Sequence, residues 1–500
     1  GVVQGVASGD QLLQATKAGA RWATMAHEGK LLEVFGEMVA DGMANTPRKL
    51  DDRFARSVWK TAVETADRFN NPGLFTALIG FEWSSVPSGD NLHRVVIFRD
   101  GADKAGQVLP FSLFDSEDPA DLWRYAAAYE RKTGGRMLTI PHNGNLSAGR
   151  MFETQQFDGS PLTKDYAELR MRYEPLIETT QIKGDGETHP LISPDDQFAD
   201  FERWDLGNLL VTKRTSPELM QFEYTRAGLK QGLLQGKLLG ANPFKYGMIG
   251  ATDSHTSFAS AEEDNYLGKY GIATPNPERW SKRFPPLTVP GVLEQFAEWQ
   301  SSQSGLAAVW ATENTREAIW DAMYRKEVYA TTGPRMKVRF FGGWEFTQDD
   351  AVRNDLATAG YQKGVPMGGD LTGAPKGAAP TFLITALKDP DGANLDRVQV
   401  VKGWLDAKGQ LQEKIYDAVW SGERRPNANG KLPAVGSTVD LTTATYTNSI
   451  GAVSLTTVWR DPDFDPALSA FYYARVIEIP TPRWTAYDEA RFRIRMDDAV

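Results

Sequence analysis

The stretch Tyr246-Gly-Met-Ile-Gly-Ala-Thr-Asp-Ser-His255 begins as an apolar run and ends in polar side chains. The run is short and uninterrupted, which is typical of a strand buried on both faces. The same order occurs in Arg136–Ile140, which leads into Pro141-His-Asn-Gly-Asn145, and in Leu176–Thr179, which precedes a polar loop. Polar residues that follow apolar strands are typical of a fold whose site lies at the strand ends. We therefore expect these segments to contribute to one common site.

Helical periodicity separates these strands. Over residues 12–70, apolar side chains recur at intervals of three and four positions, which predicts two or more helices. Further helices are expected over Asp118–Lys132, Pro217–Leu239 and Thr315–Lys326. Strands that alternate with helices predict an α/β fold, either a β/α barrel or a layered sheet. We expect this catalytic module to span residues 1–335.

Two more strands are expected nearer the N-terminus. Leu74–Gly80 is a nearly continuous apolar run that suits a buried strand, and Glu82 lies just past its end. Arg94–Phe98 is predicted to be the next strand, with His93 immediately before it. A hairpin or a short excursion of the chain between the two strands can therefore return His93 to Glu82.

The sequence pattern of the chain changes after Met336, from alternating helices and strands to strand-like runs. β-Branched and aromatic runs, separated by Gly, Pro and Asp turns, predict a β-sandwich-like domain over residues 336–500. Its expected strands are Phe382–Ala386, Val398–Val401, Val453–Thr457 and Phe471–Ile477. Two connecting segments rich in Gly, Pro, Ala and Asn, residues 360–380 and 424–436, are expected to be the least ordered.

Composition narrows the function classes. The net charge of -10 is spread along the chain without a basic stripe, which argues against binding to a nucleic acid duplex. No run approaches the roughly 18 apolar residues that a membrane span requires, so no membrane partner is expected. Cysteine is absent, which leaves His, Asp and Glu as the side chains for metal binding.

The chain has five histidines, and their settings differ. His27 lies in a helical region, where a role on the surface or in helix packing is expected. His93, His142 and His255 instead lie at or beside strand ends, near carboxylate or amide side chains. Asp253 and His255 can offer an oxygen and a nitrogen to one metal ion or to neighbouring ions. The alternative reading makes Asp253 a turn former or helix cap and His255 a satisfied polar residue.

Glu82 lies between two aromatic residues in Gly80-Phe-Glu-Trp83. A carboxylate in such a place is unfavourable to bury unless a cation neutralises it, and a metal ion would do so. The alternatives are an exposed glutamate on an edge strand, or one that pairs with Arg94.

Four of these segments resemble, in order, the later metal motifs of the polymerase and histidinol phosphatase (PHP) superfamily. They are Gly80-Phe-Glu82, Asn91-Leu-His93, Ile140-Pro-His-Asn-Gly-Asn145 and Gly250-Ala-Thr-Asp-Ser-His255. Longer phrases, such as Phe81-Glu-Trp-Ser-Ser85 and Tyr329-Ala-Thr-Thr-Gly-Pro-Arg335, look like a branch of large bacterial PHP-like proteins catalogued as a domain of unknown function. This resemblance is distributed over most of residues 1–345 and into 471–480.

The resemblance implies a distorted seven-stranded β/α barrel that holds two or three divalent metal ions (Zn, Mn or Fe) and hydrolyses phosphate esters. It implies that Glu82 bridges two ions, that His93 and His142 bind one of them, that Asp253 binds the other and that His255 binds a third. Glu82 and Asp253 are expected to be catalytic as well, because such ions activate a water molecule that they hold.

The superfamily also has a His-x-His motif and an Asp-His motif that this sequence lacks. Gly1-Val-Val-Gln resembles the residues directly after the second motif. We therefore expect that an N-terminal segment with three or four further ligands precedes the sequence as given. Without that segment, five ligands would hold one or two ions weakly, or none.

Three residues are candidates for substrate binding. His189 in Gly186-Glu-Thr-His-Pro190 matches the PHP-like branch, and Lys183 and Arg94 can contact an anionic substrate. The alternative for the two cations is ordinary solvation. Asp461, Asp463 and Asp465 alternate like the start of a calcium loop, but prolines intervene and an acidic turn is the preferred interpretation.

The sequence thus predicts a multinuclear metal-dependent hydrolase, a phosphoesterase with a metal-activated water and a small anionic substrate such as a phosphate ester. One alternative is a non-catalytic binding or structural protein with a depleted metal site. Another is a metal-dependent hydrolase of amide or lactone bonds. We expect a periplasmic or secreted location, with a cytoplasmic one as the alternative, and the sequence does not predict an oligomeric state.

Overall fold

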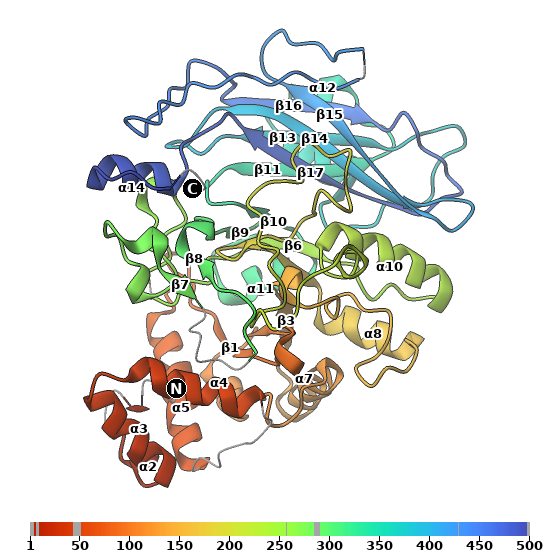
Figure 1. The fold of residues 1–500 in the computed structure, drawn as a ribbon. Helices are drawn as coiled ribbons and strands as arrows, with labels where there is room; N and C mark the ends of the chain where they lie inside the picture. The colour runs from red at the N-terminus through yellow and green to blue at the C-terminus, as the bar shows by residue number, and fades with distance from the viewer. Residues whose placement is uncertain are drawn as a thin grey trace.

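The computed structural model describes residues 5–6, 10–43, 52–256, 258–284, 291–428 and 430–497. The prediction made for Gly1-Val-Val-Gln lies outside the described residues. In Figure 1 the N-terminal helices, the strands of the predicted catalytic module and the C-terminal sheets follow one another from bottom to top.

Helices open the chain, as the periodicity predicts. They are α2 (Gln11–Gln14), α3 (Lys17–His27), α4 (Leu31–Met43) and α5 (Asp52–Phe69). Asp10 and Thr16 cap the first two, because each side chain accepts a hydrogen bond of 3.0 Å from a backbone N–H of the first turn.

The first sheet is antiparallel, in the order β1 (Ile79–Trp83), β2 (Arg94–Phe98) and β3 (Met137–Pro141). The expected strand Leu74–Gly80 was placed wrongly, since the strand begins at Ile79 and Glu82 lies inside it. Leu74 and Phe75 are 78% and 61% exposed. The turn after Asn70 continues to Phe75, which forms a β-bridge with Asn71, and so it takes up the start of the apolar run.

Helices α5 and α7 (Pro119–Thr133) pack on this sheet. Asp118 caps α7, and Gly134 ends it in the left-handed conformation (φ 65°), as its sequence signals predict. Trp83 and Trp123 are fully buried in the shared core. Burying a large apolar side chain stabilises a fold by roughly 1.5–3 kcal/mol, so this core holds the edge that carries Glu82 in place.

A second group of strands follows the first sheet. β4 (Leu176–Gln181) pairs with β5 (Gly184–Asp185) and, in parallel, with β6 (Gly247–Gly250), and β9 (Leu306–Val309) pairs with β10 (Val328–Thr331). β3 lies beside β4, and β6 lies beside β10. Within the described residues these strands form separate sheets and no closed barrel, because no strand pairing joins β9 back to β1.

Helices surround these strands, with one difference from the prediction. They are α6 (Ala102–Ala105), α8 (Lys164–Tyr173), α9 (Pro217–Met220), α10 (Thr225–Leu239) and α11 (Arg316–Tyr324). Two short strands, β7 (Arg283–Phe284) and β8 (Phe296–Ala297), pair antiparallel with each other. The helix expected over Pro217–Leu239 is divided in two. Glu223 lies at the break, where its carboxylate accepts hydrogen bonds from the Gly149 N–H and the Thr215 hydroxyl.

The C-terminal region is β-rich, as expected. One sheet has the order β12 (Gly364–Pro366), β11 (Lys337–Gly343), β13 (Thr381–Leu387) and β16 (Ser454–Arg460), and the other has the order β15 (Leu411–Trp420), β14 (Leu395–Leu405) and β17 (Ala470–Glu478). One apolar cluster, which includes Phe382, Ile384, Val398 and Val400, joins the two sheets. Figure 1 shows them stacked above the remaining strands.

Three short helices complete this region: α12 (Gln348–Ala351), α13 (Leu356–Lys363) and α14 (Trp484–Phe492). The segment 360–380, expected to be a loop, instead contains the end of α13 and all of β12. Gly360 allows this packing, because a Cβ there would lie 2.6 Å from the ring of Phe341. The glycine that suggested a loop is therefore a point of close contact.

Buried ion pairs and hydrogen bonds connect the β-rich C-terminal region to helix α10 and Asp196 in the preceding part of the chain. Arg226 on α10 is fully buried and reaches Asp196 at 2.8 Å and the hydroxyl of Tyr473 on β17 at 2.7 Å. Arg475, also on β17, bonds Asp196 at 2.7 Å. A buried carboxylate shared by two guanidinium groups fixes how β17 lies against α10. None of the described helices has the length and apolar character needed to cross a membrane.

Candidate metal centre

Three predicted ligands meet at one end of the first sheet. One carboxylate oxygen of Glu82, Oε1, lies 2.8 Å from Nδ1 of His93 and 3.0 Å from Nε2 of His142. The two imidazole rings stand edge to face with their centres 5.5 Å apart. One ligand atom from each residue lies within 4.8 Å of the other two.

Strand register explains why these residues meet. Arg94 on β2 is opposite Pro141 on β3, so one further step along both strands brings His93 opposite His142. Glu82 is opposite Val95 on the neighbouring strand, two residues from His93. Side chains two apart share a face of a sheet, which puts Glu82 diagonal to His93.

The same register rules out a pair between Glu82 and Arg94. Arg94 is opposite Trp83, so its side chain takes the other face of the sheet from Glu82. It is 1% exposed, and its Nε donates to Glu174 at 2.9 Å. Arg170 donates to the second oxygen of Glu174, also at 2.9 Å. Arg94 is therefore a core residue in this structure, bonded to Glu174 on the face of the sheet away from Glu82, and the substrate contact proposed for it stays a prediction.

The electrostatics of the cluster favour an ionised glutamate beside imidazoles. Removal of water opposes ionisation of Glu82, but the charge of His93 and hydrogen bonds from both rings outweigh it and hold its pKa well below the ordinary range. Burial lowers the pKa of His93, and Glu82 offsets this only in part. Burial acts in the same direction on His142, but the bond to Glu82 and the charge of Glu178 prevail and raise its pKa.

Buried polar atoms without a partner gather around this cluster. Among the described residues they include Nε2 of His93, Nδ1 of His142 and one side-chain oxygen each of Asn91, Asn143 and Glu178. A buried polar atom without a hydrogen bond is unfavourable by about 1–3 kcal/mol, so such a concentration is typical of a site that completes itself with a ligand.

The donor set fits a divalent metal ion. Histidine nitrogens and carboxylate oxygens bind zinc at about 2.0–2.2 Å, which puts neighbouring ligand atoms roughly 3.3–3.5 Å apart in a tetrahedral site. The distances of 2.8 and 3.0 Å within the cluster are slightly shorter. An ion between Glu82, His93 and His142 would therefore take the place of these two hydrogen bonds, with the three ligand atoms already within 4.8 Å of one another.

Asp253 and His255 form a different kind of cluster. Oδ1 of Asp253 lies 3.1 Å from Nε2 of His255. Oδ2 accepts hydrogen bonds from Gln181 at 3.0 Å and from the ammonium groups of Lys183 and Lys269. Three of these donors crowd Oδ2, whereas Oδ1 has a single contact, to the His255 ring. A metal ion at Asp253 would therefore have to compete with the two ammonium groups for the carboxylate charge.

The loop after β6 shapes this second cluster. Asp253 has a left-handed backbone (φ 50°), which is uncommon outside glycine, asparagine and aspartate and turns the side chain back toward β4. The backbone N–H of His255 donates to the Lys269 carbonyl at 2.9 Å, and the His255 side chain is 48% exposed. Burial, together with the charge of Lys183, lowers the pKa of Lys269 to about 7.

The structure thus divides the five predicted ligands into two sets. Within the part of the chain that it describes, Glu82, His93 and His142 are the only group of three or more acidic or histidine side chains close enough to share an ion. Asp253 and His255 are not part of that group. They remain within electrostatic reach, because the charge of Asp253 acts on His142.

Sequence reasoning missed Glu178. It lies on β4, is 8% exposed, and burial raises its pKa to about 7, with the charges of His142 and Asp253 acting on it in opposite directions. The signal was present, because a carboxylate inside the apolar run Leu176-Ile-Glu-Thr179 is as unusual as Glu82 between its aromatic neighbours.

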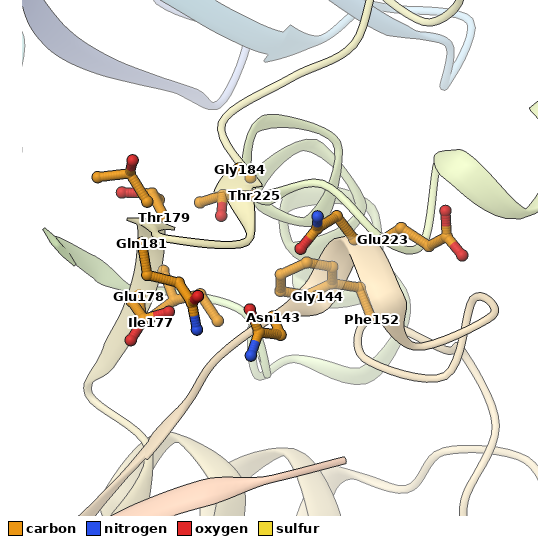
Figure 2. A pocket seen from close by; sticks show the side chains of 13 residues that line it. Asn143, Gly144, Phe152, Ile177, Glu178, Thr179, Gln181, Gly184, Glu223 and Thr225 are labelled. Carbon is orange, nitrogen blue, oxygen red and sulfur yellow. The ribbon is translucent and has the colours of Figure 1, made fainter. Parts of the chain in front are cut away.

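Figure 2 shows the pocket that Glu178 lines together with Asn143, Gln181, Thr225 and Phe152. It encloses about 250 Å³ of empty space, its open mouth included. Glu178 and Gln181 come from β4 and Asn143 from the turn after β3, whereas Glu223 points away from the centre. The lining combines amide, hydroxyl and carboxyl groups with the apolar side chains of Phe152 and Ile177.

The remaining candidates lie elsewhere. His189 is 2% exposed, and both ring nitrogens are used, Nε2 with Asp205 at 3.0 Å and Nδ1 with the Leu191 N–H at 3.2 Å. It is therefore structurally satisfied in this conformation. His27 is exposed at the end of α3. Asp461 is buried and bonds Lys402 at 2.7 Å, so the acidic turn is held by a lysine.

Comparison with known proteins gives the family. No curated protein and no solved structure matches the chain. A family model described as "Protein of unknown function (DUF3604)" matches residues 1–500. Because this match covers the whole length of the sequence, the chain belongs to the DUF3604 family.

Proposed function

We propose that the chain is a metal-dependent hydrolase, and more narrowly a phosphoesterase that acts on a small anionic substrate. The observation that carries the proposal is the Glu82–His93–His142 cluster, with its ligand atoms within 4.8 Å and unpartnered ring nitrogens on both histidines. An ionised carboxylate beside two imidazoles is a donor set for Zn, Mn or Fe.

Each group of the site has a place in such chemistry. A divalent ion bound here would supply an acidified water and neutralise charge on the substrate. Glu82 provides the anionic oxygen, and His93 and His142 provide neutral nitrogens. Lys183 and Lys269 bring positive charge to the neighbouring Asp253 cluster. That charge would attract the negatively charged phosphate group of an ester substrate.

Two observations support a PHP-like fold for this module. The strands lie in the neighbouring order β1, β2, β3, β4, β6, β10, β9, with polar residues at their ends. The metal motifs around Glu82, His93, His142 and Asp253 also follow one another in the order of the PHP superfamily. We propose that these seven strands form the wall of a PHP-like barrel.

One observation favours a second candidate, a non-catalytic binding protein with a depleted metal site. Asp253 is already neutralised by Lys183 and Lys269, and a carboxylate that is paired in this way binds a metal ion only after exchange of its partners. The two candidates differ in the metal content of the purified protein.

The first test is elemental analysis of the chain after purification without chelators. At least one equivalent of Zn, Mn or Fe per chain is expected, and its removal should abolish hydrolysis. Metal well below one equivalent, with no uptake on titration, would contradict the proposal and support the binding protein.

The second test is a substrate panel of phosphomonoesters, phosphodiesters, amides and lactones. Turnover of a phosphate ester that depends on added metal supports the phosphoesterase. Turnover restricted to amides or lactones would keep the metal-dependent hydrolase and overturn the narrower statement.

A further inference from the structure

Two lysines share a single carboxylate oxygen. Lys183, which follows β4, and Lys269 both donate to Oδ2 of Asp253, and Lys269 also donates to the Asp253 carbonyl at 3.0 Å. Their side chains are only 11% and 12% exposed. Two largely buried ammonium groups therefore lie side by side with one negative charge between them.

Two ammonium groups face one bonded carboxylate in this cluster. Glu178 and Glu298 are other carboxyls whose charges act on Lys269, and in the described part of the chain neither bonds either ammonium group. The repulsion between Lys183 and Lys269 is thus relieved only in part, and a second anion would relieve it further.

The lysine pair is also close to the proposed metal core. The charge of Lys183 acts on His93, and the charge of Asp253 acts on His142. β4 contributes to both clusters, because the charge of Glu178 acts on His142 and Gln181 donates to Asp253. An anion held by the lysines would therefore lie beside the Glu82 cluster.

We propose that Lys183 and Lys269 form an anion subsite for the phosphoryl group of the substrate, with Asp253 as the counter-ion that positions both lysines. The identity of the anion as a phosphoryl group rests on the proposed function, whereas the subsite itself does not. Lysine suits this task because its ammonium group is a compact charge with three donors. Lys269 already contacts the Asp253 carbonyl, Oδ2 and, at 3.3 Å, Nε2 of His255, so it would exchange one of these contacts for a phosphate oxygen. The exposed ring of His255 marks the solvent side of the subsite.

The probe for the test is inorganic phosphate, titrated calorimetrically into the full chain. Lys183→Met and Lys269→Met should each weaken phosphate binding by about tenfold or more, because each removes a partly desolvated charge that contacts the anion. Lys269→Arg should retain most of the affinity, since it keeps the charge.

The matched control is Lys230→Met. Lys230 is also 12% exposed and ion-paired, to Glu413 at 2.5 Å, but it lies on α10 against the β-rich region. Its replacement should leave phosphate binding unchanged. Thermal unfolding of each variant shows whether the fold is retained. If a methionine variant does not fold, the phosphate affinity of Lys269→Arg is compared with that of the wild type instead.

The outcomes separate this inference from the proposed function. Loss of phosphate binding in both lysine variants with unchanged metal content supports the subsite. The same loss in a chain that binds no metal and hydrolyses nothing keeps the subsite and overturns the phosphoesterase. The third outcome is that the chain binds metal and hydrolyses a substrate, but phosphate affinity is equal in the wild type, Lys183→Met, Lys269→Met and Lys230→Met. That result would overturn the subsite alone.

Discussion

The Glu82 cluster and the Asp253 cluster are two halves of one predicted ligand set, yet they differ in how their charge is balanced. Glu82 has only imidazoles as partners, and both rings keep a buried nitrogen without a hydrogen bond. Asp253 has Gln181, His255 and two lysines as partners, and the lysines already neutralise its charge. The first cluster is short of positive charge and the second already contains it.

This difference shows that a ligand motif and a ligand site are separate things. Asp253-Ser-His255 has residue types and a spacing that suit a metal ion, but its neighbours in space provide cations of their own. Glu82, His93 and His142 are far apart in sequence but meet through strand register, and only imidazoles bond Glu82. We therefore expect a metal ion at the first cluster before the second.

The largest expected effect is on metal affinity, and it tests directly whether the Glu82 cluster binds a metal ion before the Asp253 cluster. His142→Ala should weaken binding of the first metal ion by roughly 100- to 1000-fold, because a zinc site gains roughly 10–16 kcal/mol from about four ligands. His255→Ala should change that first affinity by less than about tenfold. Competitive titration with a metal indicator measures both.

His27→Ala is the control for the loss of a histidine, since His27 is exposed on α3. Equal effects of His142→Ala and His255→Ala would break the comparison, because they would show that both clusters hold the same ion.

The second prediction concerns stability. Asp253→Asn should lower the free energy of unfolding by roughly 2–3 kcal/mol, because it leaves Lys183 and Lys269 together without their shared anion. This value lies below that for a fully buried ion pair, since the side chains keep 11–17% exposure. Urea unfolding of the metal-free chain measures it. An unchanged midpoint would show that the lysines do not depend on Asp253.

The third prediction uses the pH dependence of stability. The pKa of Glu178 is raised from 4.5 to about 7, so the stabilising contribution of its neutral form is present below pH 4.5 and is lost as the pH rises through about 7. Glu178→Gln removes that loss. Between pH 5 and 8, the variant should gain roughly 2 kcal/mol relative to the wild type. Parallel pH profiles in the presence of a chelator would contradict the burial of an ionisable Glu178.

Local patterns account for the parts of the fold that the sequence predicts. The caps of α7 at Asp118 and Gly134, and the apolar runs of β2 and β14, are signals within a few residues, and each predicted an element that the structure contains. The start of β1 was misplaced, because the bridge between Asn71 and Phe75 depends on how a turn closes and not on hydrophobicity.

The site was predictable to the extent that it follows strand ends. His93 and His142 were identified because they flank β2 and β3, and register then brings them together. The lysine partners of Asp253 were not, since Lys183 and Asp253 are 70 residues apart and their contact depends on how a loop returns to β4. Arg94 shows the same limit, because its face of the strand becomes known only with the register.

The smallest expected effect is the counterpart of Asp253→Asn. Glu82→Gln should change the free energy of unfolding of the metal-free chain by less than about 1 kcal/mol. The Glu82 side chain is 42% exposed, and removing its charge leaves no lysine or arginine without its partner. The amide keeps an oxygen that can accept a hydrogen bond from one imidazole. Metal affinity should nevertheless fall, since an amide is a poorer ligand than a carboxylate. A large loss of stability in Glu82→Gln would mean that the glutamate holds the strands together, and the contrast between a structural Asp253 cluster and a ligand-ready Glu82 cluster would then be lost.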